Sequence, residues 1–216
     1  MKEATAKPSL RISHIVYGRQ HSGNRVTYLV DPRGQGTLRA VPEAVVLKRW
    51  RQRKFSDHIF SGARLSSTLW RAVASSLGTD TAKTCAMSLP DLTFKVESSR
   101  PSLGVLKLPS AETLHVMFAV CGAARLSSIL ARHLSPEHAG KSGVPDLFLY
   151  AIQATTRRPA IARFVEVKKP EEKVSRTQLD EIEFLNSLGL HSRVLRLVDR
   201  ALPAANLGLD LDRPSL

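Results

Sequence analysis

Two acidic residues and a lysine in the second half of the chain have the types and the spacing of a phosphodiester-cleaving site. Asp146 opens an apolar run within Gly-Val-Pro-Asp-Leu (143–147), and Glu166 and Lys168 lie in Phe-Val-Glu-Val-Lys (164–168). Because side chains alternate between the two faces of a strand, Glu166 and Lys168 should point the same way. If the two runs form neighbouring strands, Asp146 reaches the edge that carries Glu166.

This arrangement predicts a metal-assisted hydrolase. Carboxylate oxygens are the ligands that Mg²⁺ and Mn²⁺ prefer, so we expect Asp146 and Glu166 to hold one of these ions. The ion acidifies a water and neutralises charge on the scissile phosphate. Lys168 can orient the attacking water or offset charge in the transition state. The alternative is an exposed Glu-x-Lys ion pair, which the apolar neighbours disfavour because they make both strands half-buried.

The motifs resemble the virus-type replication-repair nuclease (VRR-NUC) domain, a branch of the PD-(D/E)xK superfamily. The family has a Gly-x-Pro-Asp-Leu strand, a Val-Glu-Val-Lys strand, a Gly-Pro turn, a Leu-Ser motif and a Gln on the next helix. This chain has the matching residues in that order at 143–147, 165–168, Pro170, Ser175 and Gln178. The strong match covers roughly residues 140–198. A weaker match over 121–134 looks most like the nuclease domain of the Fanconi-associated nuclease.

The resemblance implies a fold, an activity and a set of site residues. The fold is an α/β restriction-endonuclease-like core, with a mixed central sheet flanked by helices. The activity is that of a metal-dependent deoxyribonuclease using Mg²⁺ or Mn²⁺. The implied catalytic residues are Asp146, Glu166, Lys168 and Gln178. The implied metal ligands are Asp146, Glu166 and the backbone carbonyl of Val167.

The chain departs from the family pattern at two places. Lys169 stands where the family has Gly before the proline of the turn. An upstream glutamate completes the metal site in close relatives, but the corresponding stretch here, residues 60–65, contains no acid. Asp57 and Glu112 are the candidates to replace it. If neither does, the site has only two carboxylates.

The net charge favours a polyanionic partner. The 216 residues contain 32 Lys and Arg against 19 Asp and Glu, a formal charge of +13. DNA is the expected partner, and no small-molecule substrate or membrane is expected. The basic segment 48–54 could contact the DNA backbone, with Trp50 stacking on a base, or could merely complete the C-terminal end of a helix. The candidate DNA contacts are Arg49, Arg51, Arg53, Lys141, Lys169 and Arg176.

Cysteine use and hydropathy point to a cytoplasmic site of action. Cys85 and Cys121 are expected to be reduced core thiols, and no Cys/His cluster has zinc spacing. We expect no apolar run long enough to cross a bilayer and no signal peptide. A secreted form would therefore leave the cell without a signal peptide.

The resemblance leaves three biological roles open. VRR-NUC domains also occur in antibacterial effectors delivered by type VI secretion, and the basic composition and the unmatched N-terminal 55 or so residues favour this role. Such a toxin would need an acidic immunity partner. The alternatives are a structure-selective DNA-repair nuclease and a non-catalytic DNA-binding protein with a degenerate nuclease fold.

Three regions are expected along the chain. Residues 1–55 form a β-hairpin and a basic helix, 56–200 the nuclease domain with its core at 110–198, and 201–216 a tail. The expected strands are 11–17, 26–30, 146–152, 161–168 and 192–198. The expected helices are 42–54, 66–77, 79–87, 111–120, 124–134 and 175–188. Residues 89–109 are expected to be an irregular connection with one or two short strands.

Overall fold

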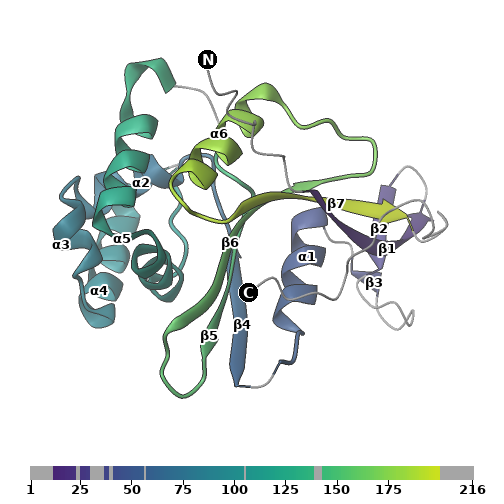
Figure 1. The fold of residues 1–216 in the computed structure, drawn as a ribbon, viewed down its shortest axis with the longest axis horizontal. Coiled ribbons are helices and arrows are strands. Elements are labelled where there is room, and N and C mark those ends of the chain that lie inside the picture. The colour runs from purple at the N-terminus through teal and green to yellow at the C-terminus, as the bar shows by residue number, and fades with distance from the viewer. Residues whose placement is uncertain are drawn as a thin grey trace, which may run out of the picture.

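The structure, a computed structural model, describes residues 12–22, 25–29, 37–38, 41–55, 57–104, 106–138 and 143–199. One sheet of seven strands runs through this part of the chain in the order β3-β2-β1-β7-β6-β5-β4 (Figure 1). Its strands are β1 (Ile12–Ser22), β2 (Arg25–Leu29), β3 (Thr37–Leu38), β4 (His58–Arg64), β5 (Leu147–Gln153), β6 (Pro159–Lys168) and β7 (Ser192–Asp199).

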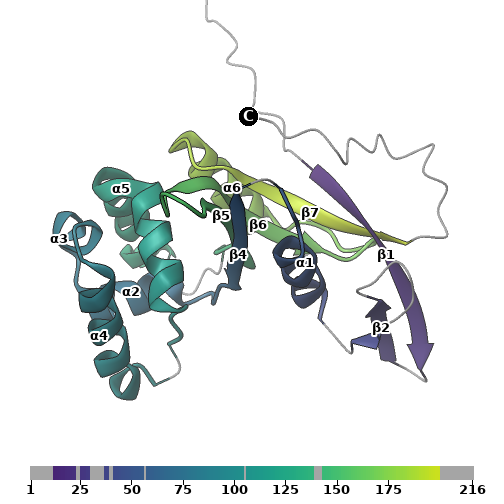
Figure 2. The same cartoon turned by 90° about the horizontal axis from the view of Figure 1, so that it is seen from below.

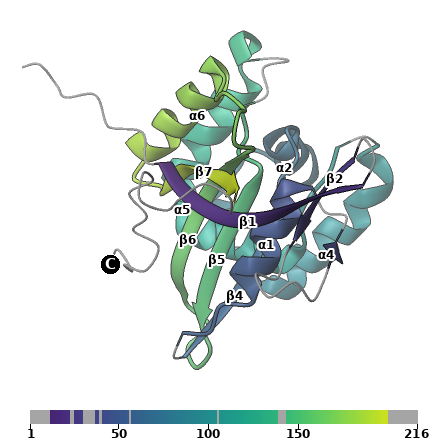
Figure 3. The ribbon, with the colours of Figure 1, turned by 90° about the vertical axis from the view of Figure 1, so that its right-hand side faces the viewer.

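The sheet is mixed, as expected. β4, β5 and β6 pair antiparallel, whereas β7 lies parallel to both β6 and β1. The N-terminal hairpin β1–β2 therefore continues the sheet of the nuclease core, because Ile12 pairs with Val194 and Tyr17 with Asp199. β1 curves strongly across the edge of the core, and α1 lies beside β4 (Figure 3).

Helices cover both faces of the central strands (Figure 2). They are α1 (Pro42–Arg51), α2 (Leu69–Leu77), α3 (Thr81–Cys85), α4 (Leu89–Ser99), α5 (Ala111–Leu134) and α6 (Arg176–Ser187). Phe148 and Phe164 face the core shared with α2, α4 and α5, whereas Leu149 and Val165 face the core shared with α1. This alternation follows from the two-residue period of a strand.

The expectation of an irregular connection over residues 89–109 was wrong for residues 89–99. Residues 89–99 form α4, with the side chain of Ser88 accepting a hydrogen bond from the amide of Asp91 and Pro90 in the first turn. Proline is tolerated there because the first amides of a helix have no partner within it. Leu92 and Val96 are buried against the other helices, so the apolar side of α4 determines its structure despite the nearby prolines and serines.

The long helix α5 contradicts the expectation that no apolar segment is long enough to cross a bilayer. By length and composition it could cross a membrane, and within the described residues it alone meets that test. Its apolar residues instead form the centre of the larger core, where Leu114, Met117 and Leu126 are buried. The helix is kinked at Gly122, whose φ of 66° favours glycine. This is the break expected between residues 120 and 124.

The cysteines are free, as expected. Cys121 is buried and Cys85 half-buried. Burial raises the pKa of the Cys121 thiol to about 12, with the nearby Cys85 acting in the same direction. A thiol held in its protonated form is a poor nucleophile and a poor metal ligand, so this pair belongs to the core.

Candidate active site

The strand register brings the acidic motifs together at one end of β5 and β6. Leu147 pairs with Val165, so Asp146, immediately before β5, lies beside Glu166. Asp146 Oδ2 accepts a hydrogen bond from the amide of Val167 at 2.8 Å. Val165 and Val167 are buried against α1, and these contacts fix β6 on that side. The predicted neighbourhood of Asp146 and Glu166 is therefore present in the fold.

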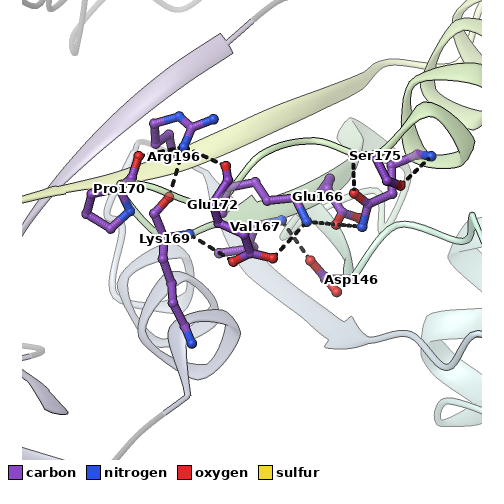
Figure 4. Close-up of polar contacts among 10 residues, drawn as sticks. Asp146, Glu166, Val167, Lys169, Pro170, Glu172, Ser175 and Arg196 are labelled. Carbon is purple, nitrogen blue, oxygen red and sulfur yellow. Dashed lines mark hydrogen bonds and ion pairs between the residues drawn. The ribbon is translucent and has the colours of Figure 1, made fainter.

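Glu166 and Lys168 form a buried ion pair on the other face of β6. Lys168 Nζ lies 3.0 Å from Glu166 Oε1, and the two residues are 4 % and 2 % exposed. A second carboxylate, Glu172 Oε1, also lies 3.0 Å from Lys168 Nζ. Figure 4 shows Glu166 and Glu172, the two glutamates that Lys168 contacts. The lysine is thus held in one position by two hydrogen-bonded acids.

Gln178 connects Glu166 to the start of α6. Its side-chain oxygen accepts a hydrogen bond from the amide of Ser175 at 3.0 Å, and the Ser175 hydroxyl accepts from the amide of Gln178 in return. This capping box satisfies amides that α6 itself cannot pair. The Gln178 amide nitrogen donates to Glu166 Oε1. Gln178 therefore orients the carboxylate as well as capping the N-terminus of α6.

Burial and repulsion from neighbouring carboxylates raise the pKa values of the two acids. Burial raises the pKa of Glu166 to about 7, and the charge of Asp146 adds to this effect while Lys168 opposes it. Burial also raises the pKa of Asp146, although the hydrogen bond from Val167 opposes this. Burial disfavours the charged form of Lys168, but the hydrogen bonds and charges of Glu166 and Glu172 outweigh it and raise the pKa of the ammonium.

The sequence of this region also matches a known domain family. Residues 105–199 match the model of the VRR-NUC domain family. The chain carries a VRR-NUC domain. No curated protein matches the sequence.

The solved structures with a similar fold include two crystal structures of paFAN1 bound to 5′-flap DNA with a gap. The complex with a two-nucleotide flap has a TM-score of 0.57 at 14 % identity over 94 % of this chain. The complex with a one-nucleotide flap has a TM-score of 0.55 at 15 % identity over 93 %. This chain spans 40 % of the paFAN1 chain in both cases. At this identity the likeness concerns the fold alone.

Arg196 holds the turn that follows β6 in the VRR-NUC domain. Its Nη1 donates to the backbone carbonyls of Lys169, Pro170 and Glu172 at 2.9, 2.7 and 2.8 Å (Figure 4). The Glu172 carboxylate also accepts from the Lys169 amide, and the hydrogen bonds from Lys168 and Lys169 lower the pKa of Glu172 although its burial acts in the opposite direction. The turn thus presents an ionised Glu172 to Lys168.

The sequence analysis missed Glu43. This residue lies in the first turn of α1, and its charge is close enough to raise the pKa of Asp146. Its Oε2 is buried and has no hydrogen-bond partner within the described residues. A sequence signal existed, because Pro42-Glu43 has the form of a helix start. However, it lies upstream of residues 60–65, the stretch that corresponds to the family's glutamate.

The two acids that were considered for this role lie elsewhere. Asp57 accepts a hydrogen bond from Thr155 at the turn between β5 and β6, which is the opposite end of these strands from Asp146. Glu112 is exposed in the first turn of α5, and it is not among the charges that act on Asp146 or Glu166. Of the three acids, only Glu43 acts on the site.

By donor type, the site residues fit a hard divalent cation. Within the described residues, no three His, Cys, Asp or Glu side chains converge tightly enough to form a cation site by themselves. Here Glu166 Oε1 is hydrogen-bonded to Lys168 and Gln178, and Asp146 Oδ2 to Val167. The unpartnered buried oxygen of Glu43 is a donor that a cation would satisfy, and buried carboxylates with raised pKa values gain from one.

The predicted DNA contacts are dispersed. Lys169 is exposed, and its side chain extends away from Glu166 (Figure 4). Arg176 is exposed at the start of α6 and pairs with Asp180 at 2.8 Å. Arg49 is half-buried on α1. Lys141 lies outside the described residues.

The basic segment at the end of α1 corrects the expectation for Trp50. Its indole is buried, and Nε1 donates to the carbonyls of Ser61 and Tyr150 at 2.9 and 3.0 Å. Trp50 therefore cannot stack on a base. Arg51 donates to the carbonyl of Gly62 at 2.7 Å and so fastens α1 to β4. The signal that could have predicted this was the apolar spacing of Val46 and Trp50 on one face of the helix.

Proposed function

We propose that this protein is a divalent-metal-dependent DNA nuclease that hydrolyses phosphodiester bonds. The observation that carries the proposal is the convergence of Asp146, Glu166, Lys168 and Gln178 at one end of β6 within a VRR-NUC domain. The net charge of +13 supports a polyanionic substrate. In the similar crystal structures, paFAN1 is bound to DNA, which supports DNA over other polyanions.

The site residues have different roles in phosphodiester hydrolysis. A Mg²⁺ or Mn²⁺ ion held by Asp146, Glu166 and the carbonyl of Val167 would acidify the attacking water and neutralise charge on the phosphate. Lys168, kept protonated by Glu172, offsets the charge that builds in the transition state. Gln178 holds one oxygen of Glu166 and leaves the other free for a ligand.

Glu43 would complete the ligand set from α1. A cation paired with Glu43 Oε2 would relieve the cost of a buried oxygen that lacks a partner. A helix N-terminus favours the ionised carboxylate at this position. The site then offers three carboxylates. The absence of the family's upstream glutamate is therefore a weaker argument for a non-catalytic protein with a degenerate nuclease fold.

Cleavage of plasmid DNA tests the activity. We expect cutting by the wild type with Mg²⁺ or Mn²⁺, no cutting in EDTA, and loss of cutting in Glu166→Gln. Glu97→Gln, which changes an exposed glutamate on α4, is the matched control and should cut like the wild type. Full cleavage in EDTA, or by Glu166→Gln, would refute the mechanism. DNA binding by the wild type without metal-dependent cutting would favour the non-catalytic alternative.

For the biological role we propose an antibacterial effector that acts in the cytoplasm of a target cell. The excess of basic residues fits a protein that an acidic immunity partner could cover. A structure-selective repair nuclease is the second candidate, because the similar paFAN1 structures hold flap DNA. Growth arrest on expression of the wild type, but not of Asp146→Asn, would favour the effector. Normal growth and a strong preference for flaps over plain duplex would favour repair.

A further inference from the structure

Three arginines gather on the α1 face of the sheet, away from the catalytic carboxylates. Arg163 lies between Ile161 and Val165 on β6, so it points to the α1 side. Arg193 on β7 is the register partner of Val165 and shares that face. Arg53 follows α1 and brings the third guanidinium to the same place, as its charge on Arg163 indicates. Together these three residues are called the arginine platform.

The indole of Trp50 supports the platform. Its ring is fixed by two hydrogen bonds to backbone carbonyls. The Cζ atoms of Arg53 and Arg163 lie 5.3 and 5.9 Å from the centre of this ring, and that of Arg53 lies 5.8 Å from the Phe60 ring. Guanidinium groups held against aromatic rings keep their donors available while losing conformational freedom. The arginines are therefore held in place before any ligand arrives.

The platform concentrates positive charge that, at Arg53 and Arg163, no carboxylate of the described residues balances. In the described part of the chain, neither Arg53 nor Arg163 forms an ion pair with an acid. Arg193 donates to the Ser13 hydroxyl at 3.3 Å. Burial lowers the pKa of Arg163 to about 10, and the charges of Arg193 and Arg53 act in the same direction. An anion bound here would offset both the burial and the repulsion.

Measured along β6, the separation between the platform and the catalytic end of the strand fits a DNA backbone, with Arg163 on the α1 face and Lys168 on the opposite face. From Arg163 to Lys168, β6 advances five residues, about 16 Å at 3.3 Å per residue. From Glu43 to Arg51, the last residue of α1, the helix advances eight residues, about 12 Å at the helical rise, and Arg53 lies two residues further along the chain. Duplex DNA advances about 3.4 Å for each nucleotide of one strand, so this distance corresponds to four or five base pairs.

We propose that the arginine platform binds backbone phosphates of duplex DNA about four or five base pairs from the bond that is cut. This inference rests on the proposed nuclease function and adds to it a second contact with the substrate. Guanidinium groups suit phosphate because their donors can bind two oxygens at once. The contact reads no base, so it contributes affinity at any sequence.

The test compares two variants that remove equal charge. One is Arg53→Gln with Arg163→Gln, and the control is Lys95→Gln with Arg100→Gln, whose residues are exposed on and just after α4. Affinity for a fluorescein-labelled 30-base-pair duplex is measured in EDTA by anisotropy over a range of salt concentrations. For the platform variant we expect affinity to fall about tenfold or more at 50 mM salt, and the slope of log affinity against log salt to flatten by about 1.8 for two lost phosphate contacts. The control pair should change neither by a comparable amount.

Cleavage kinetics give a second measurement. In Mg²⁺ the platform variant should raise KM while kcat at saturating DNA stays within about twofold, because the catalytic residues are untouched. Arg53→Gln alone, at an exposed position, repeats the test with an expected slope change of about 0.9 if the double variant is poorly folded by circular dichroism.

The outcomes test the DNA contact at the platform separately from the nuclease function. If the platform variant and the control variant bind DNA alike, the platform is not a DNA contact. If the wild type neither binds nor cuts duplex DNA, the nuclease function itself fails. Loss of affinity and a flatter slope in the platform pair only would support the inference.

Discussion

The buried carboxylate of Glu166 should make the metal-free protein less stable as the pH rises. Its pKa is raised to about 7 from an ordinary value of 4.5, because burial disfavours the charge. Between these two pH values the folded protein binds a proton that the unfolded chain has released. Stability is therefore highest below about pH 4.5 with respect to this group, and is lost as the pH rises towards 7.

The size of the effect follows from the shift. About 2.5 pKa units correspond to ~3 kcal/mol at 1.36 kcal/mol per unit. Glu166 is 2 % exposed, so solvent screens little of this penalty. Glu166→Gln keeps the shape and cannot ionise, so it should escape the loss. Its stability relative to the wild type should grow from near zero at pH 4.5 to about 3 kcal/mol above pH 7, or roughly 6–12 °C in Tm for a chain of this size.

Thermal unfolding in EDTA from pH 4.5 to 8 measures this difference. Comparing the variant with the wild type at each pH cancels the titration of groups that do not interact with Glu166. Asp146, whose pKa is raised in the same direction and whose charge acts on Glu166, contributes to the difference. Adding Mg²⁺ at pH 8 should stabilise the wild type more than the variant, because the ion adds positive charge beside the ionised carboxylate and binds only the folded site. A Tm gap that is the same at pH 5 and pH 8 would refute the raised pKa and the reasoning built on it.

Three further substitutions test other parts of the molecule. Lys168→Met should slow cleavage by about a hundredfold or more in single-turnover assays, with duplex affinity within about twofold, and normal cutting would mean that the site lies elsewhere. Glu43→Gln should raise the Mg²⁺ concentration for half-maximal cleavage by about tenfold or more, whereas Asp57→Asn should leave it unchanged; equal responses would remove Glu43 from the ligand set. Gly62→Ala should cost about 1–3 kcal/mol in urea unfolding, because the new Cβ would lie 2.6 Å from the carbonyl oxygen of Phe148, and unchanged stability would mean that β4 and β5 can separate there.

The parts of the fold that local sequence determines were predictable. β5 and β6 are apolar runs bounded by turn residues, and α6 begins with Ser175 and Gln178 in a capping box. Asp146, Glu166 and Lys168 lie within these segments or at their ends. Their proximity therefore follows from one antiparallel pairing of neighbouring strands.

Contacts between distant segments were not predictable in the same way. Sequence predicted the β1–β2 hairpin, but no local pattern indicated that β1 would lie parallel to β7. Nor did any indicate that the N-terminus of α1 would bring Glu43 to Asp146, about a hundred residues further along the chain. The same holds for Trp50, whose two hydrogen bonds are made to β4 and β5. In each case tertiary packing selects one of several partners that the sequence permits.

These distant contacts make α1 the element that connects the two proposed functions of the surface. Its first turn brings the Glu43 carboxylate to the acidic site, where a helix N-terminus favours negative charge. Its last turn and the residues beyond carry cations, which the opposite end of the dipole favours. Trp50 fixes the helix to β4 and β5, so both ends are held relative to the catalytic strand β6. A shift of α1 would therefore change metal affinity and DNA affinity together, whereas substitutions at Glu43 or at Arg163 should separate them.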